Sequence, residues 1–183
     1  ANNNKKSMIV VDELYEKFYG DSLLNKINFD KINNILIIQS LSKTGGLAGL
    51  RMGFAFGNKE LIRYLNKVTG PYDVNSFAVT ATIAALNDKK YIDDYIIEVK
   101  KAREWIKNKF QSLDCRSHFS GGNYFLIWPK KNPKQLIKEF KHNGILIRSM
   151  ESKKDLENSI RVSIGTKKQM QFFWEKFIQL EVS

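Results

Sequence analysis

Cysteine, proline and long apolar stretches are scarce in this chain of 183 residues. Its only cysteine, Cys115, can form neither an internal disulfide nor a cysteine-based metal cluster, and it fits a reducing compartment such as the cytoplasm. Apolar runs such as residues 35–38 are far shorter than the ~20 residues that cross a membrane. The N-terminal segment lacks the apolar core of a signal peptide, so we expect a cytoplasmic protein with no membrane partner.

Acidic side chains are outnumbered, with 19 Asp and Glu against 30 Lys and Arg and a formal net charge of +11. A basic balance raises nucleic acid as a possible partner. Lysines alternate with acidic residues along residues 89–109, however, and no long run of like charges occurs. We interpret the excess as a solvated surface that can attract anionic ligands, and we expect no nucleic-acid partner.

Patterns that bind metals or serve hydrolysis are missing as well. His118 and His142 stand apart, and no HExxH, CxxC or GxSxG motif occurs. We therefore expect no metal site, no zinc-dependent proteolysis and no serine-based hydrolysis.

The first half of the chain predicts an α/β fold. Apolar runs at residues 8–11 and within residues 34–39 are typical of parallel strands covered on both faces, and residues 51–56 predict a third strand. Apolar spacing then predicts helices, of which residues 89–110 form the longest and could bridge two domains.

The last third of the chain predicts a compact α+β unit. Residues 123–128, 145–148 and 160–164 predict strands, and a helix follows Pro133 until Gly144. A final helix is expected after Thr166. We therefore predict two domains, residues 1–88 and residues 89–183.

Polar side chains follow two of the predicted strands, where open α/β sheets bind their ligands. Taken singly, each is most simply a turn residue or a solvated charge. Taken together, they combine an amine, two hydroxyls, a guanidinium, a carboxylate and a phenol within one stretch of chain. They are Asp12, Tyr15, Ser40, Ser42, Lys43 and Arg51.

This combination matches the functional groups of one cofactor. The lysine amine can condense with an aldehyde to form a Schiff base. The serine hydroxyls and the arginine can hold a phosphate dianion. The aspartate can pair with a protonated ring nitrogen, and the tyrosine can hydrogen-bond a phenolic oxygen. Pyridoxal 5′-phosphate carries all of these groups, so we predict it as the cofactor.

Four motifs, in order, resemble the class I/II aminotransferases of fold type I, which use pyridoxal phosphate, and in particular histidinol-phosphate aminotransferase and its relatives. Two departures occur, because Leu14 replaces the usual Ala and Asp73 stands where Asn is common. The motifs are VVDELYEKF (residues 10–18), SLSKTGGLAGLRMGFAFG (40–57), GPYDVNSFAVTATIAALND (70–88) and SIRVSIGT (159–166).

The resemblance implies a role for each residue of the candidate cofactor site. Lys43 would form the Schiff base and move a proton between substrate and cofactor carbons. Asp12 would keep the pyridine nitrogen protonated, and Tyr15 would hydrogen-bond the phenolate oxygen. The phosphate would be held by Ser40, Ser42 and Arg51.

The same resemblance implies a substrate site in the C-terminal part of the chain. Arg161, inside the last motif, would bind a carboxylate or phosphate of the substrate. Arg148 would assist it, and Asn123 would contact the substrate from the start of its strand.

The implied activity is transfer of an amino group from an amino acid, or from a phosphorylated amino alcohol like histidinol phosphate, to a 2-oxo acid in amino-acid biosynthesis. Two alternatives stay open. The same motifs serve a pyridoxal-phosphate-dependent decarboxylase of a phosphorylated amino acid, and aminotransferase-like domains also act as non-catalytic sensors in transcription regulators.

The resemblance begins near the midpoint of the family's usual length. We therefore expect the C-terminal half of such an enzyme: part of the large cofactor-binding domain, with its mainly parallel sheet, and the complete small α+β domain. We expect this half to be inactive by itself. The intact enzyme is expected to be a homodimer with residues 71–72 near the subunit interface.

Overall fold

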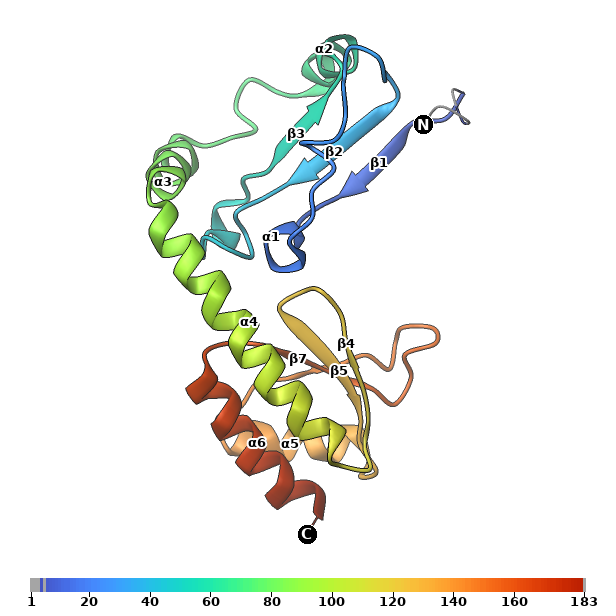
Figure 1. The fold of residues 1–183 in the computed structure, drawn as a ribbon, viewed down its shortest axis with the longest axis vertical. Helices are drawn as coiled ribbons and strands as arrows, with labels where there is room; N and C mark the ends of the chain where they lie inside the picture. The colour runs from blue at the N-terminus through green and yellow to red at the C-terminus, as the bar shows by residue number, and fades with distance from the viewer. Residues whose placement is uncertain (1–3, 5, 183) are drawn as a thin grey trace. The chain divides into compact units, whose positions relative to one another are not determined.

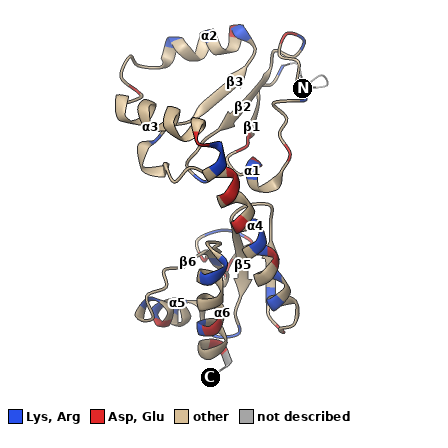
Figure 2. Cartoon of the chain, turned by 60° about the vertical axis from the view of Figure 1, so that its left-hand side comes forward, with Lys and Arg blue, Asp and Glu red and all other residues tan. Residues whose placement is uncertain are grey.

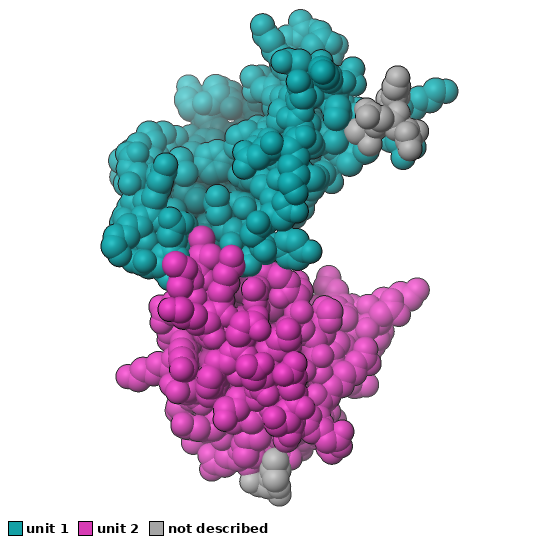
Figure 3. All heavy atoms as spheres, in the orientation of Figure 1, with its two compact units in different colours: residues 1–94 teal, residues 95–183 magenta. Residues whose placement is uncertain are grey.

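The computed structural model describes residues 4 and 6–182 and divides the chain into two compact units, Ala1–Asp94 and Tyr95–Ser183 (Figures 1 and 3). The boundary between the units falls within α4 (Lys89–Gln111), a helix of 23 residues. The division into domains at residues 88 and 89 stays a prediction.

A three-stranded sheet forms the centre of the first unit, in the order β1 (Ile9–Asp12), β2 (Ile35–Gln39), β3 (Phe54–Gly57). β1 pairs in parallel with β2, as predicted for the two apolar runs. β3 pairs antiparallel with β2, because the chain turns back at the end of β2 without crossing the sheet.

The two parallel strands differ in burial. β2 lies in the middle of the sheet, and Ile35, Leu36 and Ile37 are buried. β1 pairs on one side only, and its Val10 is 53% exposed. The prediction that both strands are covered on both faces is therefore right for β2 and wrong for β1. An apolar pattern reports what a strand is made of, whereas burial also depends on which elements pack against it.

Two helices of the first unit begin at polar side chains that accept backbone hydrogen bonds, as is typical of N-caps. The Asn58 side chain accepts from the Glu60 N–H at 2.9 Å, and the Asn75 side chain accepts from the Ala78 N–H at 2.8 Å. The elements are α1 (Glu16–Tyr19), a 3₁₀ turn (Ala48–Leu50), α2 (Lys59–Val68) and α3 (Ser76–Asn87).

Helix α3 is apolar on most of its surface but buries little of it. Ala78 and Thr82 are buried, whereas Phe77 is 82% exposed and Ile83 is 56% exposed. This exposed apolar surface is of the kind that marks an interaction site.

An antiparallel sheet forms the centre of the second unit. The predicted strand over residues 145–148 overlaps the observed two-residue strand at Arg148 alone, so this prediction is mostly wrong. One strand, β4, was not predicted because its sequence RSHF is mostly polar. The order is β4 (Arg116–Phe119), β5 (Tyr124–Trp128), β7 (Ile160–Ser163) and β6 (Arg148–Ser149). The accompanying helices are α4, α5 (Pro133–His142) and α6 (Lys167–Val182).

One face of this sheet packs against the helices through aromatic rings. Phe125 of β5 is fully buried, and its ring centroid lies 5.6 Å from that of Phe110 in α4 and 5.9 Å from that of Phe173 in α6. Phe110 also contacts Trp174 and Phe177 of α6 at 5.2 and 5.1 Å. Phe110 is therefore the centre of this core.

The second unit also carries most of the positive charge. It holds 18 of the 30 Lys and Arg but only 9 of the 19 Asp and Glu, which gives it a net charge of +9. Figure 2 shows basic residues along α4, α5 and α6. An anionic ligand is therefore attracted to this unit more than to the first one.

Membrane-spanning helices and metal-binding groups are both absent from the described part of the chain. No helix there has both the length and the apolar composition needed to cross a membrane. No three His, Cys, Asp or Glu side chains there form a group that could hold a metal ion.

We expect Phe110→Ala to destabilise the second unit by about 3–5 kcal/mol, because it removes a buried ring from the centre of the core. Urea unfolding followed by tryptophan fluorescence measures this unit specifically, since all three tryptophans lie in it. Phe172→Ala on the same α6 is the control, because Phe172 is 45% exposed and its loss should be small. Equal effects of the two substitutions would contradict the packing described here.

Candidate active site

The sheet of the first unit brings the predicted cofactor residues to one edge. Asp12, the last residue of β1, lies opposite Ile38 of β2, and Gln39, the last residue of β2, lies opposite Phe54 of β3. The loop of residues 40–53 therefore begins and ends at the edge where β1 also ends. Asp12 and the loop that carries Lys43 are neighbours for this reason.

The segment after β1 holds the first two predicted side chains. The Asp12 carboxylate is exposed, and its Oδ1 accepts the Leu14 N–H at 3.0 Å, which turns the chain as it leaves the sheet. Tyr15 follows at the start of α1. The Lys43 Nζ lies 5.8 Å from the centroid of the Tyr15 ring, so the predicted lysine and tyrosine are together.

The loop after β2 is held at its start by Ser40. Its hydroxyl donates to the Met52 carbonyl at 2.9 Å and accepts the Ser42 N–H at 3.0 Å. The hydroxyl oxygens of Ser40 and Ser42 lie 2.7 Å apart. The two predicted phosphate-binding hydroxyls therefore lie side by side, on a loop whose two ends Ser40 joins.

Glycines shape the turn that follows Lys43. A Cβ on Gly45 would lie 3.2 Å from the Leu41 Cβ, which is tighter than nearly all real contacts. Gly46 has a φ of +68°, which favours glycine. The turn thus brings the chain back over Leu41 and leaves Lys43 near Tyr15.

Arg51 is the predicted cofactor residue that the structure does not join to the others. Its side chain is exposed and donates to the Ala48 carbonyl at 3.2 Å, and no contact with Ser40 or Ser42 is found in the described residues. Its φ of 58° is left-handed, which is unfavourable for a residue with a Cβ.

The groups at this edge fit pyridoxal phosphate by their chemistry. The exposed carboxylate suits the ring nitrogen, and the half-buried amine suits the aldehyde. The phenol beside the amine suits the phenolic oxygen, and the two adjacent hydroxyls suit the phosphate. Binding of the phosphate by the Arg51 guanidinium, on the same loop, stays a prediction.

Arg148 and Arg161 lie side by side in the second unit. They are direct partners on β6 and β7, and both line a cavity of about 340 Å³ together with Ser163 and two apolar residues. The Arg161 guanidinium also lies over the Tyr124 ring, 4.2 Å from its centroid. Among the described residues that line this cavity none is a carboxylate, so its two guanidinium groups favour an anion.

Asn123, the third predicted substrate residue, lies just before β5. Its carbonyl accepts the Ile164 N–H at 2.8 Å, which extends the pairing of β5 with β7 by one step. Asn123 does not line the cavity of Arg148 and Arg161. Its contact with substrate stays a prediction.

A further polar cluster, which the sequence analysis did not single out, lies next to Asp12. Glu13 is 8% exposed, and its carboxylate accepts the Ser22 hydroxyl at 2.7 Å, the Leu23 N–H at 2.7 Å and the Gln39 amide at 2.9 Å. Burial alone would raise the pKa of Glu13, but these hydrogen bonds together lower the pKa below its ordinary value. The carboxylate is therefore charged at neutral pH.

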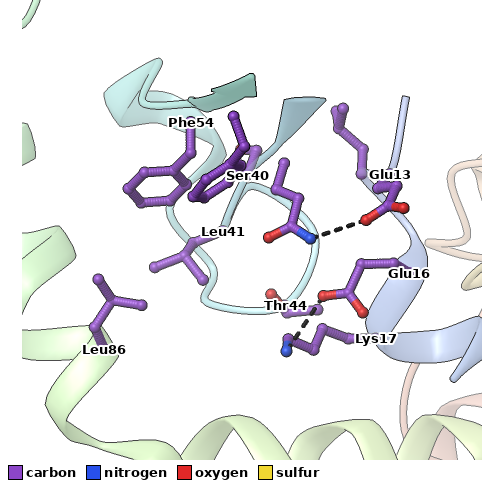
Figure 4. A pocket seen from close by; sticks show the side chains of 11 residues that line it. Glu13, Glu16, Lys17, Ser40, Leu41, Thr44, Phe54 and Leu86 are labelled. Carbon is purple, nitrogen blue, oxygen red and sulfur yellow. Dashed lines mark hydrogen bonds and ion pairs between the residues drawn. The ribbon is translucent and has the colours of Figure 1, made fainter. Parts of the chain in front are cut away.

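The Glu13 cluster lines a cavity of about 350 Å³. Figure 4 shows Leu41, Phe54 and Leu86 on one side of this cavity and Glu13, Glu16 and Lys17 on the other. Asp12 does not line it, because successive residues of a strand point to opposite faces. Lys43 does not line it either, but Ser40, on the same loop as Lys43, does.

Comparison with known proteins identifies the family. Residues 1–177 match the family model for aminotransferases of class I and II. The chain belongs to this family. A histidinol-phosphate aminotransferase of Clostridium beijerinckii is 34% identical over 177 residues, and one of Brachyspira hyodysenteriae is 36% identical over 179. These matches cover 94% and 95% of the chain but 49% and 50% of the relatives, so the chain spans about half the length of the curated aminotransferases it matches.

Solved aminotransferase structures share the fold. A histidinol-phosphate aminotransferase from Clostridium acetobutylicum superposes with a TM-score of 0.86 at 24% identity, over 97% of this chain and 55% of its own. One from Sinorhizobium meliloti, solved in complex with pyridoxal 5′-phosphate, has a TM-score of 0.81 at 19% identity, over 97% of this chain and 50% of its own. The predicted fold class, part of a fold-type I large domain followed by a small α+β domain, is confirmed.

In this aminotransferase chain, we expect Ser40→Ala to loosen the loop of residues 40–53. The substitution leaves the Met52 carbonyl and the Ser42 N–H without their partner, which costs about 1 kcal/mol and accelerates amide exchange in the loop about fivefold. Ser42→Ala is the matched control, because it keeps both of these bonds. The geometry is wrong if hydrogen exchange shows the larger change in Ser42→Ala.

Proposed function

We propose that the protein containing this chain is a pyridoxal-phosphate-dependent aminotransferase. It moves an amino group from a donor that carries a phosphate, in the manner of histidinol phosphate, to a 2-oxo acid. One observation carries this proposal: Lys43, Tyr15 and Asp12 lie at one edge of the sheet, in a chain that belongs to the aminotransferase family.

The cofactor, when bound, supplies an aldehyde that joins amines and a ring that accepts electrons from the substrate carbon. The Asp12 carboxylate is exposed at the end of β1 and can pair with a protonated ring nitrogen. Tyr15 offers a phenol hydroxyl to an oxygen of the ring, and Ser40 and Ser42 offer adjacent hydroxyls to the phosphate. These assignments rest on the residue chemistry and on the contacts described above.

Proton transfer is assigned to the Lys43 Nζ. When the substrate amine takes the place of the Lys43 amine on the cofactor, the Lys43 amine would lie close to the substrate carbon. It could then take a proton from that carbon and return it elsewhere. The neighbouring Tyr15 ring limits where the lysine chain can move, which supports a fixed proton path.

Substrate recognition is assigned to Arg148 and Arg161. Two guanidinium groups on neighbouring strands can bind one phosphate or carboxylate with several charge-assisted hydrogen bonds. The curated relatives are named for a phosphorylated substrate, which supports a phosphate in this position.

A homodimer in the cytoplasm is part of the same proposal. Exposed apolar side chains gather on and before α3, with Tyr72 at 91% and Phe77 at 82% exposure, and such surfaces are typical of subunit interfaces. The free thiol of Cys115 supports a reducing compartment.

We expect pyridoxal phosphate and borohydride to label Lys43 in the complete protein that carries these residues. Peptide mass spectrometry identifies the labelled lysine. Lys43→Ala should lose the label and at least 99% of transaminase turnover, because no other amine occupies this position. Lys59→Ala, on the surface of α2, should change neither. Equal labelling of many lysines in the unsubstituted protein would contradict the assignment.

We expect Arg161→Ala and Arg148→Ala to lower kcat/KM for a phosphorylated amino donor by about 10–100-fold, since each loses a charge-assisted bond to the phosphate. An unphosphorylated analogue of the donor should be affected much less. Arg116→Ala is the control, because Arg116 lies on the same sheet face but stacks on Trp128.

Product analysis with a phosphorylated amino acid as the substrate separates transamination from decarboxylation, because a phosphorylated amino alcohol has no carboxyl group to lose. A keto product is expected, and release of carbon dioxide with no keto product would replace the proposed reaction by a decarboxylase.

A further inference from the structure

We propose that Glu13 is a positioning residue for the cofactor site, because its carboxylate ties the end of β1 to the end of β2 and to the segment after α1. The inference rests on the proposed function for its chemical meaning. The contacts of Glu13 themselves do not depend on that function.

Glu13 joins three separate pieces of chain. Its backbone N–H donates to the Ile38 carbonyl at 2.8 Å, which continues the β1–β2 pairing one step beyond Asp12. Its carboxylate accepts the Gln39 amide from β2 and, from the segment after α1, the Ser22 hydroxyl and the Leu23 N–H. One side chain thus connects residues on three elements.

The residues that Glu13 fixes are direct neighbours of the candidate cofactor residues. Asp12 precedes Glu13, and Gln39 precedes Ser40. A shift of Glu13 therefore moves the Asp12 carboxylate, and a shift of Gln39 moves the hydroxyl on which the loop of residues 40–53 depends. Glu13 acts through these neighbours, since it lines a cavity together with Gln39 and Ser40, whereas Asp12 points to the opposite face of the strand.

The chemistry of the cluster favours a carboxylate at this position. All three partners donate hydrogen bonds, and a carboxylate is an acceptor only. Among the described residues, Glu13 forms no ion pair, so its charge is stabilised by neutral donors inside the fold. A glutamine of the same shape would turn an NH₂ group toward at least one of these donors.

Three variants of the complete protein test the role. Glu13→Gln keeps the shape but loses an acceptor. Glu13→Gln combined with Gln39→Glu exchanges the amide and the carboxylate, and thus restores a donor–acceptor pair between β1 and β2. Glu16→Gln is the matched control, because Glu16 lines the same cavity but pairs with Lys17 of its own helix.

Two readouts are measured in each variant at one pH. The first is amide hydrogen exchange at Leu23, which contacts Glu13, and at Leu14, which contacts Asp12. The second is the rate at which pyridoxal phosphate and borohydride label Lys43. A residue that only anchors the segment after α1 changes the exchange at Leu23 and nothing else.

We expect Glu13→Gln to accelerate exchange about tenfold at both Leu23 and Leu14 and to slow labelling of Lys43 several-fold. The double variant, Glu13→Gln with Gln39→Glu, should restore most of the normal hydrogen-exchange rates and of the Lys43 labelling rate. Glu16→Gln should match the unsubstituted protein in both measurements. Faster exchange at Leu23 with unchanged Leu14 and unchanged Lys43 labelling would overturn the positioning role.

A milder variant keeps the test valid if Glu13→Gln does not fold. Ser22→Ala removes one donor, and it should change Leu14 exchange in the same direction by a smaller factor; no change there also overturns the inference. If the unsubstituted protein is not labelled at Lys43, the proposed function fails, whereas the exchange at Leu14 still decides the role of Glu13.

Discussion

The parallel pairing of β1 with β2 is the constraint on which the candidate cofactor site depends. It ends both strands at one edge, so that Asp12 and the loop carrying Lys43 become neighbours without a direct bond between them. Backbone pairing thus sets the positions, and the side chains at those positions supply a carboxylate, an amine and hydroxyls. The Glu13 carboxylate strengthens the same junction from the opposite face.

In the second unit, side chains along each strand point alternately to the two faces of the sheet. In β5, Phe125 and Ile127 face the aromatic core, and Leu126 between them lies opposite Arg161. Core and candidate substrate surface are therefore two sides of the same strands. The arginines lie on the sheet whose other face carries the ring packing, which suits the anion-binding role proposed for them.

Local patterns predicted the elements that depend on local sequence. The apolar run of β2 and the periodic helix α4 were both recognised, and the four motifs located Lys43 and Arg161. The exposed face of β1 was missed, because apolar composition does not report what packs against a strand. Glu13 was missed because its partners Ser22 and Gln39 lie 9 and 26 residues away, and only the folded chain brings them together.

The left-handed backbone at Arg51 couples stability to chemistry at one residue. Glycine would adopt this conformation without the penalty of a Cβ, which is about 1 kcal/mol or more. The same replacement would delete the guanidinium assigned to the phosphate. If Arg51 has the role proposed for it, stability and cofactor affinity are opposed at this position, and selection for heat resistance alone would favour a more stable protein that binds the cofactor less tightly.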